Sequence, residues 1–183
     1  LRIICGWRYK SDIPSESKFS RVFKELSDLQ IAAKTHEQFV KEYLSNTVFM
    51  YNAIDATKIP LRVKPVKVEK EENPKNKVGR PKKSEVKEPK QPTILQQQQT
   101  MTTTKEMLSL VSTHCGVGIK QNSKGNREVW IGGKLHISAV DGDIPITAFY
   151  SGANVHDSSV ALPLINETSK RVNYFYDLQD AGY

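Results

Sequence analysis

The stretch GKLHISAVDGDIPITAFY (133–150) contains two largely apolar runs that flank the letters DGD. An Asp-Gly pair between two such runs is typical of a tight hairpin turn. We therefore predict two antiparallel strands, over 133–140 and 144–150.

Two further runs extend this hairpin into a sheet. TVFMYNAID (47–55) and VNYFYDLQ (172–179) are rich in β-branched and aromatic residues, which predicts one strand each. Between the hairpin and the last strand, Asp157 can N-cap an apolar helix, in which Pro163 removes one hydrogen bond or starts a second short turn. This element order predicts a mixed sheet with a covering helix, an α/β architecture.

A helical region precedes the sheet. Residues 14–30 place apolar side chains at helical spacing, and a second helix is predicted from Thr35, where Thr35 and Gln38 have the spacing of a capping box. The sequence thus divides into a helical N-terminal region (1–46) and a sheet domain (47–183). The apolar stripe of the first helix is most simply core; it comprises Phe19, Val22, Phe23 and Leu26.

The positive charge of the chain is concentrated in one segment. The 183 residues include 27 Lys and Arg against 20 Asp and Glu, a net charge of +7. Between Arg62 and Lys90 there are 11 basic and 5 acidic residues, so this segment alone carries +6. That distribution excludes a uniformly basic DNA-coating protein. Together with the glutamine run that follows, we expect residues 62–100 to form a basic, disordered insertion in the sheet domain.

The basic arm contains VGRPKK (78–83), whose GRP core resembles an AT-hook, a motif that lies in the minor groove of AT-rich DNA. We expect Arg80, Lys82 and Lys83 to contact DNA, through non-specific phosphate contacts more than through sequence reading. A flexible basic linker is the alternative interpretation.

Cysteine usage and hydropathy restrict the setting of the protein. Cys5 and Cys115 lie 110 residues apart with no CxxC spacing, so neither a zinc site nor a disulfide framework is predicted. No apolar run approaches the roughly 20 residues that span a bilayer. We expect a cytoplasmic protein without a membrane partner.

Two carboxylates close predicted strands. Asp55 ends the first and Asp180 follows the last, so both are expected at the carboxyl ends of strands, where ligands gather in such sheets. Converging carboxylates repel each other unless a cation lies between them, and oxygen ligands favour Mg²⁺ or Mn²⁺. The pattern is compatible with a two-metal phosphoryl-transfer site. Caps or surface turns are the alternative.

Several motifs, in the same order along the chain, resemble the DDE transposases of bacterial insertion sequences. The N-terminal LRIICGW and IPSESKFSRVFKEL (13–26) resemble the helical region that precedes the catalytic domain of that family. The catalytic-domain matches are IDATKIPLRVKPVK (54–67), GRPKK (79–83), GGKLHISAVDGDIPITAFYSGANVHDSSVALPLI (132–165) and DAGY (180–183). The resemblance implies an incomplete ribonuclease H-like fold and an enzyme that cleaves DNA at element ends and joins the freed 3′-hydroxyl to target DNA.

The resemblance also assigns roles to residues. Asp55 and Asp180 match the first two catalytic, metal-binding carboxylates, which implies a site for two Mg²⁺ or Mn²⁺ ions. The third, a glutamate, has no counterpart because the sequence ends three residues past Asp180, and it begins at Leu1. We therefore expect a fragment at both ends that is inactive alone. A homodimer acting on paired DNA ends in the bacterial nucleoid is implied by family only.

Other polar residues near these motifs have two interpretations each. Asn154, His156 and Asp157 match a family motif near the active face, and we expect them beside the metal ligands, although turn and cap roles are simpler. Lys134 and His136 share one face of a strand and either approach a DNA phosphate or face water. The alternative functions are a non-catalytic DNA-binding remnant of a transposase and a small metal-dependent nuclease.

Overall fold

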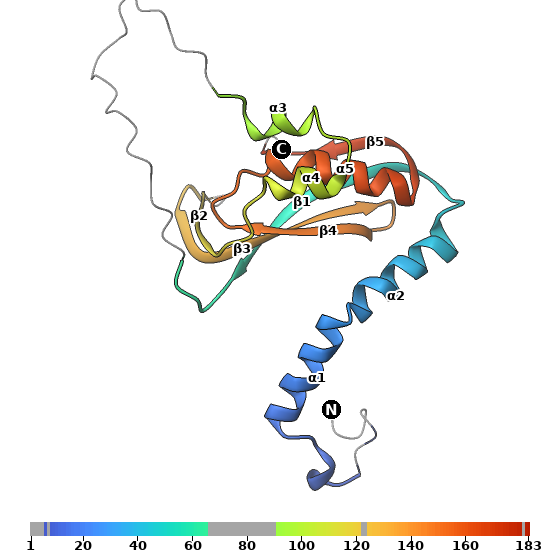
Figure 1. The fold of residues 1–183 in the computed structure, drawn as a ribbon, viewed down its shortest axis with the longest axis vertical. Helices are drawn as coiled ribbons and strands as arrows, with labels where there is room; N and C mark the ends of the chain where they lie inside the picture. The colour runs from blue at the N-terminus through green and yellow to red at the C-terminus, as the bar shows by residue number, and fades with distance from the viewer. Residues whose placement is uncertain (1–5, 7, 66–90, 122–123, 181) are drawn as a thin grey trace, which may run out of the picture. The chain divides into compact units, whose positions relative to one another are not determined.

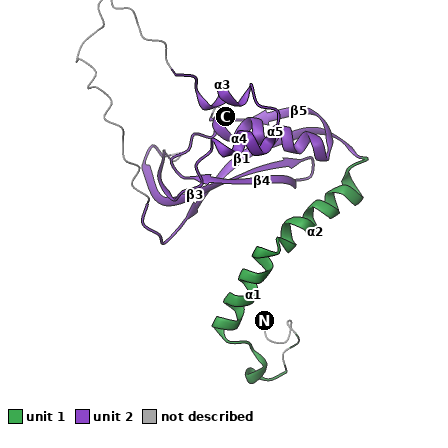
Figure 2. Cartoon of the chain, in the orientation of Figure 1, with its two compact units in different colours: residues 1–46 green, residues 47–183 purple. Residues whose placement is uncertain are grey.

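The computed structural model describes residues 6, 8–65, 91–121, 124–180 and 182–183. The chain divides into two compact units, residues 1–46 and residues 47–183, coloured separately in Figure 2. Arg80, Lys82 and Lys83 lie outside the described residues, so the predicted DNA contacts of the arm are not addressed by the fold.

The first unit is helical. Its elements are η1 (Lys10–Asp12), α1 (Glu16–Asp28), α2 (Ile31–Phe39) and the π-helical turn η2 (Val40–Leu44). Gln30, with a left-handed φ of 53°, separates α1 from α2. The second helix therefore begins before Thr35, and the predicted capping box at Thr35 is wrong, because that residue lies inside α2.

The apolar stripe of α1 is not core, contrary to the prediction. Phe23 is 76% exposed, and Phe19, Val22 and Leu26 are each about half exposed. Among the described residues of this unit, Val40 is the buried hydrophobic side chain. A helix without a packed apolar face gains little from burial.

The second unit is a mixed α/β domain built on a five-stranded sheet (Figure 1). Its elements are β1 (Val48–Pro60), α3 (Ile94–Gln98), α4 (Thr104–Ser109), β2 (Gly116–Gln121), β3 (Arg127–Val140), β4 (Ile144–Gly152), α5 (Ser158–Arg171) and β5 (Asn173–Gln179). Strand β1 lies between β3, which is antiparallel to it, and β5, which is parallel. Strand β3 also pairs with β2 and with β4, both antiparallel.

The predicted hairpin is confirmed. Strands β3 and β4 pair antiparallel on either side of a turn in which Gly142 and Asp143 both have positive φ, 79° and 60°. Asp141 accepts hydrogen bonds from the backbone N–H groups of Met50 and Tyr51, which fixes the turn against the start of β1. Asp141, which belongs to the turn predicted from the sequence, thus also connects the hairpin to β1.

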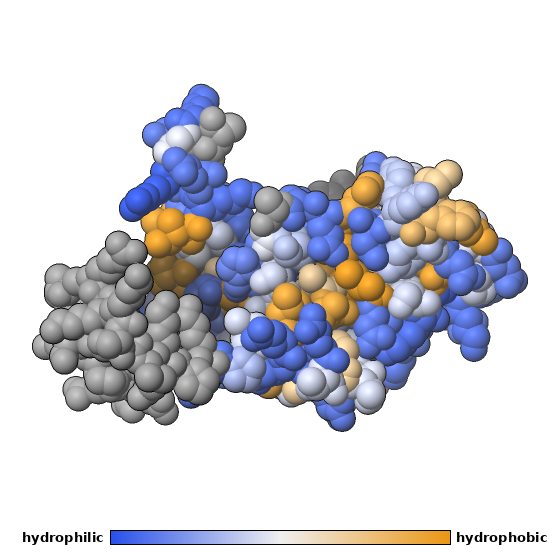
Figure 3. Space-filling model, turned by 90° about the horizontal axis from the view of Figure 1, so that it is seen from above, coloured by the Kyte–Doolittle hydropathy of each residue, from blue (hydrophilic) through white to orange (hydrophobic). Residues whose placement is uncertain are grey.

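The helices α3, α4 and α5 gather on one face of the sheet (Figure 1). The core under α5 contains Ile54, Val111, Val160 and Leu164. Pro163 is buried inside the uninterrupted helix α5, so it starts no second turn. Apolar side chains also reach the surface, where Figure 3 shows orange patches among blue hydrophilic residues.

The glutamine run is not part of a disordered insertion. Thr93 and Gln96 form a capping box that begins α3, and Gln98 is fully buried. Its Nε2 donates to the backbone carbonyls of Met107 and Ser159, at 3.1 and 2.8 Å. Helix α3 is therefore attached to both α4 and α5, and the insertion is shorter than the predicted 62–100.

Candidate functional site

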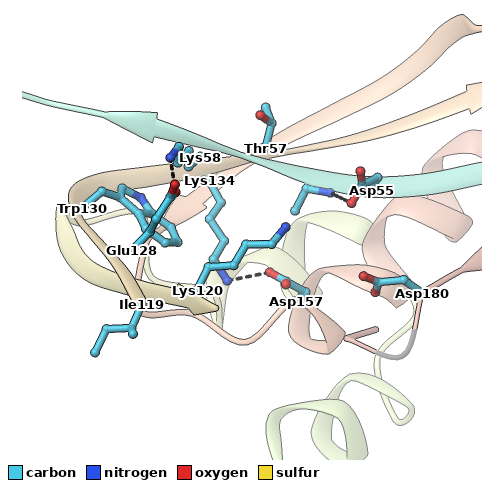
Figure 4. A pocket seen from close by; sticks show the side chains of 11 residues that line it. Asp55, Thr57, Lys58, Ile119, Lys120, Glu128, Trp130, Lys134, Asp157 and Asp180 are labelled. Atoms are coloured by element: carbon cyan, nitrogen blue, oxygen red, sulfur yellow. Dashed lines mark hydrogen bonds and ion pairs between the residues drawn. The ribbon is translucent and has the colours of Figure 1, made fainter. Parts of the chain in front are cut away.

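The parallel pairing of β1 with β5 brings the two predicted carboxylates together. Ile54 pairs with Gln179, the last residue of β5, so Asp55 is the next residue of β1 and Asp180 directly follows β5. Neighbouring strands lie about 4.8 Å apart, which places the two residues near each other. Both aspartates are exposed and line one pocket of about 400 Å³ (Figure 4). Strand β1 continues to Pro60, so Asp55 ends the pairing with β5 rather than the strand itself.

A third carboxylate, Asp157, lines the same pocket. A Cβ atom added at Gly182 would lie 3.0 Å from Oδ1 of Asp180 and 3.6 Å from Oδ2 of Asp157, so these two carboxylates flank one small glycine. Asp157 stands at the N-cap position of α5, but its side chain makes no cap hydrogen bond. The predicted cap is therefore wrong, and the carboxylate instead faces the pocket.

Lys134 holds Asp157 in place. Its Nζ donates to Oδ1 of Asp157 at 2.8 Å and to the backbone carbonyl of Val155 at 2.9 Å. The two side chains are 16% and 26% exposed, so the pair is shielded from most solvent. Lys134, which sequence suggested for DNA contact, thus lines the pocket but is already engaged by a carboxylate.

The opposite end of the pocket is basic and aromatic. Lys58, Lys120 and Trp130 line it, and Lys58 forms an ion pair with the exposed Glu128. The hydrogen bond from Lys58 holds the pKa of the Glu128 carboxyl below its usual value. Trp130 donates from Nε1 to the carbonyl of Gly133 at 3.2 Å, which fixes its ring. These residues lie on β1, β2 and β3, and sequence reasoning missed them because lysines on exposed strands are common.

His136 is not exposed on its strand face, contrary to the prediction. It is fully buried, with Nδ1 2.9 Å from the Tyr183 hydroxyl and Nε2 2.8 Å from Oγ of Ser151. Oγ of Ser151 also donates to the carbonyl of Gly152 at 3.3 Å, which favours the tautomer in which Nε2 carries the proton and Nδ1 accepts from the Tyr183 hydroxyl.

The charge states of His136 and Tyr183 follow from their surroundings. Burial lowers the pKa of His136 to about 4, although the negative charges of Asp157 and Asp55 oppose the shift. The imidazole is therefore neutral at pH 7. Burial also raises the pKa of Tyr183, and the carboxylates of Asp157, Asp55 and Asp180 raise it further. All three carboxylates thus disfavour ionisation of the Tyr183 hydroxyl.

The remaining predicted residues lie outside the pocket lining. Asn154 is exposed and its side chain lies against Gly116 and Gly152, where a Cβ would clash with it. His156 is also exposed and its Nδ1 is 2.8 Å from the hydroxyl of Ser158. Of the three residues expected beside the metal ligands, the structure brings only Asp157 to the pocket.

The donor set of the pocket fits a hard divalent cation. Asp55 and Asp180 offer carboxylate oxygens, which Mg²⁺ and Mn²⁺ prefer. Oδ1 of Asp55 accepts from the N–H of Ala56 at 2.7 Å, and Oδ1 of Asp180 accepts from the N–H of Gly182 at 2.8 Å, so each keeps one oxygen for a metal. Over the parts of the chain that are described, no group of three His, Cys, Asp or Glu side chains is arranged to hold a metal ion.

Comparisons with known protein families, with curated proteins and with solved structures gave no match for this chain. A search of the described helices for a segment long and apolar enough to cross a membrane found none.

Proposed function

We propose that this chain is part of a DDE-type transposase, which cleaves DNA and transfers the cut strand by metal-assisted phosphoryl transfer. The observation that carries the proposal is the position of Asp55 and Asp180, one residue beyond the paired Ile54 and Gln179 on adjacent parallel strands. Carboxylates on neighbouring strands, lining one pocket, are what a two-metal site on a ribonuclease H-like sheet requires.

The strand order supports the same proposal. Strands β1, β3 and β4 form consecutive antiparallel neighbours, and β5 returns on the other side of β1 and parallel to it. The first carboxylate is thus on the central strand and the second follows the strand beside it. Strand β2, paired with the first part of β3, is an addition to this arrangement.

In the proposed reaction, bound divalent cations would lower the pKa of the attacking water or 3′-hydroxyl and stabilise the leaving oxygen. Asp55 and Asp180 are the residues that would hold them. Lys134 keeps Asp157 from adding an unpaired negative charge beside them. Lys58 and Lys120, at the other end of the pocket, lower the repulsion that an incoming DNA phosphate meets.

DNA is the partner in this proposal, with transposon ends and target DNA as substrates and a homodimer as the acting form. The contacts proposed for Arg80, Lys82 and Lys83 rest on the sequence. A third acidic ligand is required from outside the motifs matched here, so we expect the 183-residue chain to be inactive alone. A non-catalytic DNA-binding remnant is the second candidate, and the ion pair of Asp157 with Lys134 favours it, because that lysine offsets the charge of the third carboxylate in the pocket.

Binding of Mn²⁺ to the purified chain, followed by isothermal titration calorimetry, tests the proposed site. We expect Asp55→Asn and Asp180→Asn each to weaken binding at least about tenfold, because each removes one of two charged ligands. Asp143→Asn is the matched control, since Asp143 is an exposed carboxylate in the β3–β4 turn, away from the pocket. Equal affinity in all four proteins would refute the metal site.

A strand-cleavage assay with Mg²⁺ separates the two candidate functions. We expect DNA binding without cleavage from the 183-residue chain. Magnesium-dependent cleavage that Asp55→Ala abolishes would overturn the expected inactivity and exclude the non-catalytic remnant. DNA binding together with absent Mn²⁺ binding would favour the remnant.

A further inference from the structure

Among the described residues, Tyr183 joins the turn that carries Asp180 to the rest of the sheet domain. Within the turn, the N–H of Gly182 donates to Oδ1 of Asp180 at 2.8 Å and the N–H of Tyr183 donates to the carbonyl of Asp180 at 3.3 Å. These bonds shape the turn but do not join it to another element. The side chain of Tyr183 makes that connection.

Tyr183 is anchored in two ways. Its ring packs against the core cluster under α5, and it meets the His136 ring edge to face, with centroids 6.0 Å apart. Its hydroxyl donates to Nδ1 of His136, whose other nitrogen is occupied by Ser151. His136 and Ser151 are both fully buried, so the acceptor side of this bond is shielded from solvent.

The acceptor lies on the strand next to the site. His136 pairs with Ala56 across β1 and β3, and Ala56 directly follows Asp55. A hydrogen bond from Tyr183 to His136 therefore fixes the Asp180 turn relative to the Asp55 backbone. Among the described strands β5 pairs with β1 and lies at the edge of the sheet, so no strand on its other side holds the turn.

We propose that Tyr183 is a positioning residue, which uses the buried His136–Ser151 pair to hold the Asp180 carboxylate beside Asp55. The inference rests on the proposed metal site for its functional meaning, because positioning matters most where two carboxylates share a cation. It explains why a histidine, with one donor and one acceptor nitrogen, is buried at this place: the serine takes the donor and the tyrosine uses the acceptor.

The test compares Tyr183→Phe with the native chain in two measurements. The first needs no metal: amide hydrogen exchange of Gly182, followed by NMR. Loss of the hydroxyl keeps the ring in the core but releases the turn, so we expect exchange to become about fivefold faster. The second is Mn²⁺ affinity, which we expect to weaken about fivefold at unchanged stoichiometry.

Tyr174→Phe is the matched control. Tyr174 is a half-buried tyrosine of β5 whose hydroxyl bonds with Asp177 and Asn52, away from the pocket lining. The Tyr174→Phe variant also loses a hydrogen bond, so it reproduces a general loss of stability without changing a contact of the Asp180 turn. We expect Gly182 exchange and Mn²⁺ affinity to remain native in this variant. His136→Gln, whose amide also offers one donor and one acceptor, should retain part of the native protection at Gly182.

The outcomes separate the two proposals. Native exchange at Gly182 in Tyr183→Phe would overturn the positioning role, whatever the metal result. Faster exchange with native Mn²⁺ affinity would also overturn it, because the turn would then be attached without positioning a ligand. If the native chain binds no Mn²⁺, the proposed metal site fails, and the exchange measurement still decides whether Tyr183 holds the turn.

Discussion

The buried histidine makes the stability of the sheet domain depend on pH in a defined window. The pKa of His136 is about 4 in the folded chain, whereas an unfolded histidine has a value near 6.5. Between these values the unfolded chain binds a proton that the folded chain does not. Stability is therefore complete above about pH 6.5 and falls as the pH drops towards 4.

The size of the effect follows from the same two values. Going from pH 7 to pH 5 should cost about 2 kcal/mol of unfolding free energy through His136 alone. We would measure urea unfolding by circular dichroism at pH 7, 6 and 5. His136→Gln removes the titrating group. The unfolding free energy of this variant should be lower at pH 7, but it should fall about 2 kcal/mol less than that of the native chain between pH 7 and pH 5.

The exposed His156 supplies the control, because His156→Gln leaves the buried ring in place and should retain the native slope. An equal pH slope for His136→Gln and the native chain would refute the reasoning. The ring nitrogen shifts of native His136, followed by NMR, give a second reading. Protonation of that ring near pH 6.5 would mean that the imidazole is not held in the buried, neutral state described above.

Two further predictions concern buried polar contacts. Lys134→Met leaves the Asp157 carboxylate and the Val155 carbonyl without their shared donor. We expect it to lower the free energy of unfolding in urea by about 2 kcal/mol. The double variant that also carries Asp157→Asn should recover part of this loss. Gln98→Ala removes the donor shared by two buried carbonyls and should lower the free energy of unfolding by about 2 kcal/mol. Gln99→Ala, at an exposed position with no such bond, should change it by less than about 0.5 kcal/mol. Equal effects of the two substitutions would contradict the attachment of α3 through Gln98.

Local chemistry was sufficient to predict the elements with strong patterns. The β3–β4 hairpin follows from an Asp-Gly turn between apolar runs, and α1 follows from the helical spacing of apolar residues over 14–30. Both signals act within a few residues, so they survive without knowledge of the rest of the chain. Strand β2 was missed because Gly116 and Gly118 interrupt its pattern, although Gly118 is required where the Trp130 ring crosses it.

Residues whose role depends on a distant partner were mostly misread. The alternation of Lys134 and His136 on one strand face indicated shared exposure, yet one is an ion-pair partner of Asp157 and the other is buried. Tyr183 was noticed only as the last letter of DAGY, because its partner lies 47 residues earlier. A sequence pattern gives the face of a strand but not what covers that face.

By itself the sequence determined four of the five sheet-forming segments, their order, the concentration of positive charge in one segment, and the position of Asp55 and Asp180 near strand ends. Only the tertiary structure decided that the two aspartates share a pocket, because this depends on β5 returning parallel to β1 in a register that aligns Ile54 with Gln179. It also decided that His136 is buried and bonded to Tyr183 and Ser151 rather than exposed on its strand face. Register is set by pairing between segments more than 70 residues apart, where local propensity has no influence.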